Sequence, residues 1–225
     1  MKERGIIFCQ DLIPGVMSGA ITVTSRIITP QPDLSPTHGF SWKGRCYGAN
    51  LDNSPYLPNF LADAPFRVGE RYVKEAWQAF DAVTGKPILG SLNPQPGICV
   101  TGYKATEGDR AREYHDAPYG GPWRSPMFMP RWAARTWIEI LAVKPARCQE
   151  ITTEEILASG VRNVARKRRV FCCSDGRDYG HASTLLAYVS LWNRLNEKRR
   201  GFPWSLNAWV WRCTFRTVCT DARRG

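Results

Sequence analysis

The stretch MPRWAARTWIEI, residues 129–140, determines how the rest of the chain is interpreted. Pro130 holds the backbone extended and disfavours helix before it. From residue 136 to residue 143 the apolar side chains fall on both faces of an alternating pattern, with Ile138 and Ile140 against Trp137, Leu141 and Val143. The pattern predicts a strand that is buried on both sides.

Two arginines and a tryptophan stand at the start of this strand: Arg131, Trp132 and Arg135. A guanidinium group matches the geometry of a phosphate, and a flat aromatic ring stacks on a base. The stretch therefore predicts a binding site for a nucleotide or for RNA. A second interpretation is that the tryptophans belong to the core and the arginines to a solvated rim.

Composition favours a polyanionic partner. The chain has 225 residues with a formal net charge of +11, and its 31 Lys and Arg residues are interspersed with 26 aromatic residues (9 Trp, 8 Tyr, 9 Phe). Nucleic acid is the commonest polyanion bound by a chain of this kind. A plain aromatic core would have the same composition. A length of 225 residues predicts one domain over residues 1–225.

The chain shows no sign of export or of metal binding. Its first apolar run, residues 5–9, is too short for a signal peptide, and no run approaches the length of a membrane span. The eight cysteines include no pair at zinc-ligand spacing, and the three histidines are far apart in sequence. We expect a protein of the reducing cytoplasm, with neither a metal nor a cofactor.

Two further strands carry candidate site residues. Residues 21–29 alternate and place Thr22, Thr24 and Arg26 on one face, which lines either a polar pocket or an exposed edge. Residues 71–77 place Glu75 on an apolar face next to Lys74 and Trp77. A carboxylate on a buried face has a raised pKa or, more commonly, an ion pair with an arginine.

The remaining segments predict insertions, helices and a last strand. Residues 31–65 and 81–125 are rich in turn residues and are expected to be loop-rich insertions. A capping-box spacing at residues 152–155 starts one helix, and apolar residues at helical spacing predict another over residues 185–196. Residues 162–169 carry five positive charges, either on a solvated surface or against a phosphate backbone. Residues 209–218 alternate as a strand, with its arginines facing outward.

Four short motifs suggest a family. They are VKEAW at residues 73–77, MPRWA at 129–133, LW at 191–192 and WVW at 209–211. With their surroundings, in blocks 2–30, 68–77, 125–161 and 191–218, they resemble the ASCH domains of bacteriophages and bacteria, which belong to the PUA-like superfamily. The resemblance implies an α+β fold, a small and mainly antiparallel β-barrel with flanking helices, and a phage-encoded protein.

The resemblance also implies two kinds of activity. Some members of the family hydrolyse N4-acetylcytidine with a Lys, a Thr and a Glu, and others bind RNA. The Thr corresponds to Thr24, whereas Ile21 stands at the Lys position and Ser159 at the Glu position. Amide hydrolysis needs an activated nucleophile and a proton carrier. Thr24 with Glu75 as a substitute carboxylate is therefore the only catalytic pair the sequence suggests.

Three functions from different classes follow from these observations. They are an RNA- or nucleotide-binding module with a degenerate catalytic set, an amidohydrolase of modified nucleosides, and an accessory protein that binds a host protein. Strand ends in a small barrel converge on one rim. We therefore expect the site residues to meet there, with ligand-binding Thr22, Arg26, Lys74, Trp77, Arg131, Trp132 and Arg135 around catalytic Thr24 and Glu75.

Overall fold

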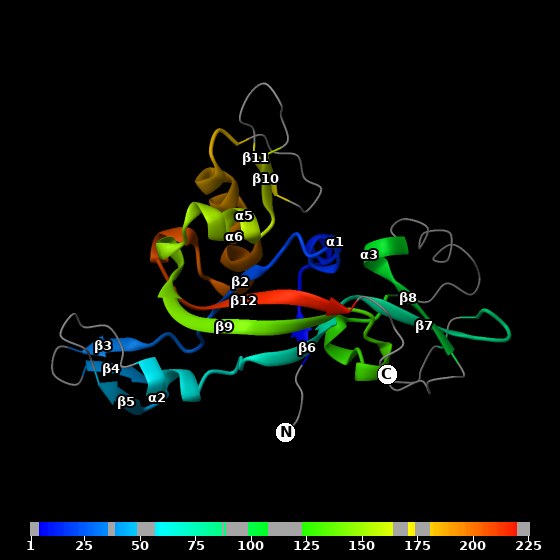
Figure 1. Cartoon of the computed structure of the whole chain (residues 1–225), viewed down its shortest axis with the longest axis horizontal. Helices are drawn as coiled ribbons and strands as arrows, with labels where there is room; N and C mark the ends of the chain where they lie inside the picture. Colours follow the sequence, from blue (N-terminus) through cyan, green and yellow to red (C-terminus); the bar gives the residue numbers. More distant parts are fainter. Residues whose placement is uncertain are drawn as a thin grey trace. The chain divides into compact units, whose positions relative to one another are not determined.

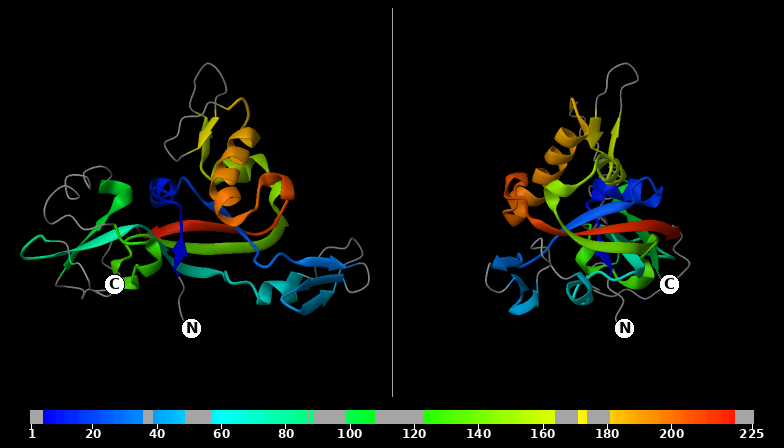
Figure 2. Two further views of the ribbon diagram at one scale, coloured as in Figure 1. Left: turned by 180° about the vertical axis from the view of Figure 1, so that it is seen from behind. Right: turned by 60° about the vertical axis from the view of Figure 1, so that its left-hand side comes forward.

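A computed structural model describes residues 5–35, 39–48, 57–86, 88, 99–107, 123–163, 171–173 and 181–219. These residues form a mixed α+β fold, as predicted (Figure 1). Its main sheet has five strands in the order β1-β6-β9-β12-β2, with bounds β1 Ile6–Ile7, β6 Gly69–Lys74, β9 Trp137–Arg147, β12 Trp209–Cys219 and β2 Val23–Ile27. The two longest strands, β9 and β12, lie side by side in Figures 1 and 2.

The predicted barrel is wrong for the part of the chain that the structure describes. The main sheet is open, with β1 and β2 as its outer strands, and it includes a parallel pair, β1 with β6, as well as the antiparallel pair β12 with β2. Closure would require the outer strands to pair along their lengths. Strand β1 has only two residues and offers too few backbone groups for that ladder.

The chain divides into two compact units, each assembled from separated segments. Unit 1 contains Met1–Ala20, Glu70–Glu139 and Arg216–Gly225, and unit 2 contains Ile21–Gly69 and Ile140–Phe215. The strands β9 and β12 contribute residues to both. A single domain over the whole chain stays a prediction.

One core of unit 2 forms where two helices cover β2 and β12. These are α5 (Thr153–Ala158) and α6 (Thr184–Arg200), which lie together with the hairpin of β10 (Val161–Asn163) and β11 (Phe171–Cys173). The capping box at the start of α5 is confirmed: Thr152 Oγ1 accepts from the Glu155 N–H at 3.2 Å, and Glu155 Oε2 accepts from the Thr152 N–H at 3.1 Å. Two donors at the helix start are satisfied in this way.

The buried face of α6 differs from the predicted stripe. Tyr188 and Trp192 are buried as expected, but Ala187 and Leu191 complete the buried face and Leu185 is exposed. The 3-10 turn η5 (Trp204–Leu206) places the Trp204 ring 5.8 Å from the Tyr188 ring and 6.0 Å from the Trp192 ring.

The first predicted insertion contains regular structure. Within residues 31–65, β3 (Asp33–Ser35), β4 (Gly39–Trp42) and β5 (Arg45–Gly48) form a three-stranded antiparallel sheet that precedes α2 (Leu57–Ala62). The burial of β4 alternates regularly, but the strand has only four residues, so its pattern is a weak signal in the sequence. Phe60 stacks on Trp211 of β12 at 4.6 Å, so the insertion shares a core with the main sheet of unit 2.

The outward position predicted for Arg212 is wrong. Its side chain is only 2% exposed, and it donates to Glu155 Oε2 at 3.0 Å and to the carbonyl oxygens of Glu150 and Arg147 at 3.0 and 3.1 Å. Lys144 also pairs with Glu155, at 2.9 Å. Burial disfavours the charged form of Glu155, but the hydrogen bonds from Lys144 and Thr152 and the charge of Arg212 together lower its pKa.

The variant Glu155→Gln tests the role of this ion pair. We expect it to lower the free energy of unfolding by about 3 kcal/mol at pH 7, because Arg212 then keeps a buried charge without a carboxylate. A folded pKa below the ordinary 4.5 means that the stabilisation by Glu155 is fully present above pH 4.5 and is lost as the pH falls through the lowered value. Urea unfolding of both proteins over a pH series checks this. A difference that persists in strong acid would contradict it.

Candidate nucleic-acid interface

The nine predicted site residues fall in both units. Thr22, Thr24 and Arg26 lie at or on β2 in unit 2, whereas the other six lie in unit 1: Lys74, Glu75, Trp77, Arg131, Trp132 and Arg135. The structure brings the six residues of unit 1 into one neighbourhood, as the contacts below show. The two sets are described separately.

A break between two strands of unit 1 positions Glu75. The strand predicted over residues 71–77 consists of the end of β6 and the start of β7 (Trp77–Asp81), which pairs with β8 (Cys99–Tyr103). Glu75 lies in the gap, and its N–H donates to Met129 Sδ at 3.3 Å. The predicted burial of Glu75 next to Trp77 is confirmed.

Glu75 and Arg135 form a buried, bidentate ion pair. Arg135 Nε donates to Glu75 Oε1 at 2.8 Å and Nη2 to Oε2 at 2.7 Å, with the side chains 12% and 1% exposed. Arg135 Nη1 also donates to Thr106 Oγ1 at 3.0 Å, from α3 (Lys104–Glu107). The carboxylate therefore compensates the charge of Arg135, and the ion pair expected from sequence is present.

Arg135 is also fixed by an aromatic ring. Its guanidinium carbon lies 4.0 Å from the centroid of Tyr103, and the Tyr103 hydroxyl donates to the Ala133 carbonyl at 2.7 Å. These contacts attach residues 131–135, which include the turn η3 (Arg131–Ala133), to β8. Arg135 thus fixes the position of residues 131–135.

Three other cations of unit 1 lie over aromatic rings. The distance from cation to ring centroid is 5.8 Å for Lys74 over Tyr72, 5.1 Å for Arg124 over Trp77 and 5.1 Å for Arg131 over Trp137. Arg124 is held next to Trp77 by backbone hydrogen bonds in both directions, at 2.8 and 3.4 Å. Cations at these distances are attracted to the ring face.

Three tryptophans in the same cluster have unused donors. The indole N–H groups of Trp77, Trp132 and Trp137 are buried and have no acceptor among the residues that the structure describes. Trp77 and Trp132 meet edge to face, with ring centroids 6.2 Å apart. An indole nitrogen can only donate, and a buried donor without an acceptor costs free energy.

The core interpretation holds for part of the tryptophan set. Trp77 and Trp137 are buried, whereas Trp132 is half-buried and lies at the margin of the cluster. Arg131 is exposed next to it. Residues 129–140 therefore contain both a core tryptophan and an exposed arginine, which agrees with the second interpretation, and binding of a nucleotide or RNA stays a prediction.

The three residues of unit 2 lie on or beside β2, against the last strand. Thr24 is opposite Cys213 and Arg26 is opposite Trp211, while the carbonyl of Thr22 accepts from the Phe215 N–H at 2.8 Å. Burial raises the pKa of Cys213 to about 12, and the nearby charge of Arg26 opposes that rise.

The two positions where the chain departs from the family pattern carry no titratable side chain. Ile21 is buried in the core of unit 2. The Ser159 hydroxyl donates to the Glu155 carbonyl at 2.7 Å, at the end of α5. Thr24 and Glu75 belong to different units.

Sequence reasoning missed Arg124. It lies in the second predicted insertion, and its guanidinium group donates to Gln78 Oε1 at 3.0 Å and to the Ile88 carbonyl. The adjacent residues Trp123 and Arg124 form the same aromatic–cation pair as Arg131 and Trp132, which was an available signal. The basic run at residues 162–169 lies, from residue 164 onward, outside the described residues.

Comparisons of this chain with family models, with curated proteins and with solved structures found no match. In the described part of the chain, no group of three or more His, Cys, Asp or Glu side chains is placed to hold a metal ion. No helix among the same residues has the length and apolar character needed to cross a membrane.

The variant Glu75→Ala tests the buried ion pair of unit 1. Removing the carboxylate leaves Arg135 with an uncompensated charge, so the free energy of unfolding should fall by about 3–5 kcal/mol. Glu139→Ala is the matched control, since Glu139 pairs at 2.6 Å with Arg216, whose side chain is exposed. Such a pair contributes about 0–1 kcal/mol. The losses are measured by thermal or urea unfolding. Equal losses for the two variants would show that the buried pair of Glu75 contributes no more to stability than the exposed pair of Glu139.

Proposed function

We propose that the chain is a binding module of the ASCH type for RNA or a nucleotide, and that unit 1 holds its binding surface. The observation that carries this proposal is the set of cations that lie over aromatic rings. We name this set the cation–aromatic cluster. It consists of Lys74, Arg124 and Arg131 with Tyr72, Trp77, Trp132 and Trp137.

The chemistry of the cluster is complementary to nucleic acid. Guanidinium, ammonium and indole groups are all donors and never acceptors. Their natural partner is therefore an anion with many acceptor oxygens, such as a phosphodiester with its neighbouring base carbonyls. Half-buried Trp132 adds an aromatic surface on which a base can stack.

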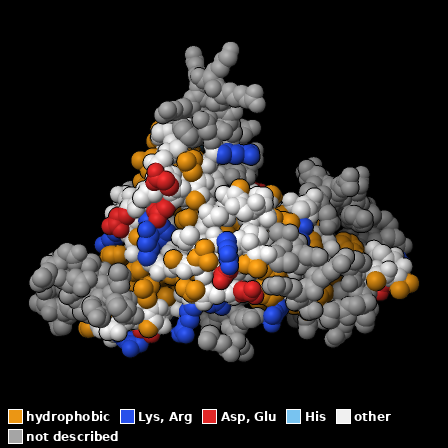
Figure 3. All heavy atoms as spheres, in the orientation of Figure 1, with side chains coloured by type: hydrophobic (Ala, Val, Ile, Leu, Met, Phe, Trp, Pro, Cys, Tyr) orange, Lys and Arg blue, Asp and Glu red, His pale blue; other side chains and the backbone are white. Residues whose placement is uncertain are grey.

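The charge distribution supports binding to an extended backbone. The formal net charge is +11. On the face drawn in Figure 3, the Lys and Arg side chains of the described residues form small separate groups with hydrophobic side chains between them. Cations interspersed with apolar groups suit a single strand, which offers phosphates and unstacked bases in alternation.

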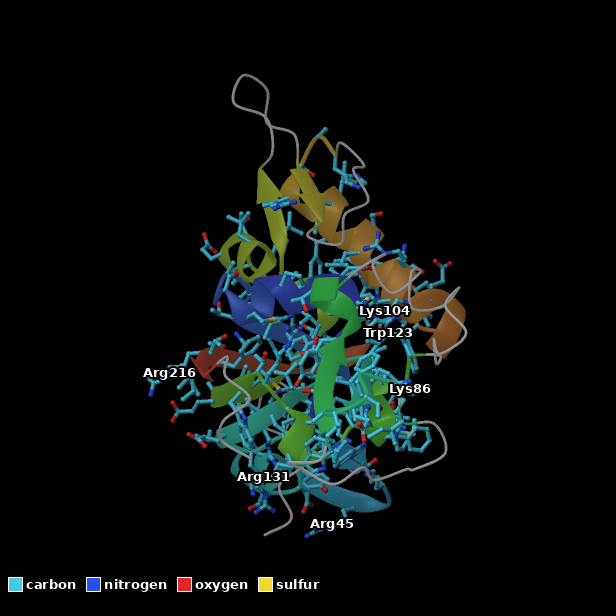
Figure 4. All side chains as sticks on the ribbon, turned by 90° about the vertical axis from the view of Figure 1, so that its right-hand side faces the viewer. Arg45, Lys86, Lys104, Trp123, Arg131 and Arg216 are labelled. Atoms are coloured by element: carbon cyan, nitrogen blue, oxygen red, sulfur yellow. The ribbon has the colours of Figure 1, made fainter. Side chains whose placement is uncertain are left out.

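Within the cluster, Arg131 is the best candidate for a phosphate contact. Arg135 and Arg124 are only partly exposed. Arg131 is exposed, and its guanidinium group extends from the edge of unit 1 in Figure 4. Its stack on Trp137 restricts its side chain in advance, so less conformational entropy is lost when a ligand binds.

The ASCH assignment within this proposal is supported by where the resemblance falls. Its four blocks contain β1 with β2, then β6, then β9 with α5, and finally most of α6 with β12. All five strands of the main sheet thus come from the blocks that resemble the family. The buried Ile21 and the occupied Ser159 hydroxyl favour binding over amide hydrolysis.

Salt-dependent binding of a labelled single-stranded RNA tests the proposal. We expect log affinity to fall linearly with log salt concentration, and Arg131→Ala to reduce the slope by about 0.7, the value of one phosphate contact on a single strand. Arg216→Ala is the control, since Arg216 is an exposed arginine of the same unit that projects away from Arg131 in Figure 4 and pairs with Glu139. It should leave the slope nearly unchanged.

Two results would refute this proposal. One is an affinity for RNA that does not depend on salt, which would favour a protein partner. The other is a slope of log affinity against log salt concentration that Arg131→Ala leaves unchanged. That result would make the basic run at residues 162–169 the next candidate for the phosphate contacts.

A further inference from the structure

An exposed apolar tip lies directly before residues 129–140. It is the 3-10 turn η2 (Pro126–Phe128), in which the side chains of Met127 and Phe128 are 64% and 59% exposed. The two adjacent side chains form an exposed apolar surface that includes an aromatic ring.

The tip is held rigidly by hydrogen bonds on both sides. Ser125 Oγ accepts from the Met127 N–H at 3.3 Å, and the Ser125 carbonyl accepts from the Phe128 N–H at 3.1 Å. Lys74 Nζ donates to the Met127 carbonyl at 2.9 Å. The next residue, Met129, is buried. The two apolar side chains therefore project from a fixed support, which lowers the entropy cost of binding through them.

Positive charge surrounds the tip. The ammonium group of Lys74 contacts its backbone, and a carbonyl is a neutral acceptor, so this contact leaves the charge of Lys74 uncompensated. Arg131 is exposed three residues after Phe128. Among the described residues of unit 1, Val83 is also strongly exposed, in a turn where the carboxylate of Asp81 accepts from its N–H at 3.0 Å and Lys86 is exposed three residues later. The tip differs from Val83 in presenting two adjacent large side chains, one of them aromatic, beside its cations.

We propose that Phe128 is the residue on which an unpaired base of the RNA stacks, with Met127 against the edge of that base. This inference rests on the proposed function and assigns it a contact residue outside the cation–aromatic cluster. The flanking cations, Lys74 and Arg131, are placed for the phosphates on either side of the stacked base. A base inside a duplex is already stacked on its neighbours, so the tip selects single strands.

The experiment compares two probes on the full chain, using fluorescence anisotropy. One probe is a labelled oligouridylate, and the other is an abasic oligonucleotide of the same length, which keeps the phosphates but has no bases. Phe128→Ala should weaken binding of the oligouridylate about tenfold, a value within the range for one base stack. It should leave binding of the abasic probe unchanged. Phe128→Trp should retain affinity, and Val83→Ala should have no effect on either probe.

The outcomes separate this inference from the proposed function. If the wild-type chain binds neither probe, the proposed function fails and the inference fails with it. If Arg131→Ala weakens binding but Phe128→Ala does not, the proposed function stands and the base-stacking role of Phe128 is refuted. An equal loss on both probes would also refute it. Anionic phosphatidylglycerol vesicles form a third arm: loss of vesicle binding in Phe128→Ala, with RNA binding intact, would make the tip a lipid contact and overturn the inference.

Discussion

The buried carboxylate of Glu75 is the constraint on which unit 1 depends. A carboxylate that is 1% exposed needs a cation and hydrogen-bond donors, and Arg135 supplies both through two parallel bonds. Arg135 lies within residues 129–140, and Glu75 lies between β6 and β7. The ion pair therefore joins two segments that are sixty residues apart. The Tyr103 ring under Arg135 adds β8 to the same assembly.

This constraint divides the arginines of unit 1 into two kinds. Arg135 is compensated and buried, so its contribution is to hold the loop from residue 129 to residue 135 in one conformation. Arg131 is exposed on that loop and lies over Trp137, which is part of the core. An internal ion pair therefore supports a surface cation, and the rigid loop between them also carries half-buried Trp132. The proposed interface is built on fixed backbone, as recognition of a flexible single strand requires.

Local patterns in the sequence predicted two kinds of element: those whose partners are close in the chain, and strands whose buried positions alternate regularly. The alternation at residues 136–143 and 209–218 gives β9 and β12, and the spacing of Thr152 and Glu155 gives the start of α5. The predicted burial of residues 136–143 on both sides is wrong after Ile140, because Leu141 is 46% exposed. Partners distant in sequence could not be predicted in this way. Arg212 alternates as an outward residue but contacts Glu155 and three backbone carbonyls. The strand β4 has only four residues, so its regular alternation is a weak signal. The open sheet instead of a barrel has the same origin, because no pattern gives the two-residue length of β1.

Mapping of RNA contacts by ultraviolet cross-linking tests the central claim most directly. A uridine-containing single strand is cross-linked to the full chain, and the adducts are assigned to peptides by mass spectrometry. The account predicts adducts on the segment from Trp123 to Arg135, with Phe128 and Trp132 as the modified residues, and their loss at high salt. Adducts confined to unit 2, including the basic run at residues 162–169, would contradict it.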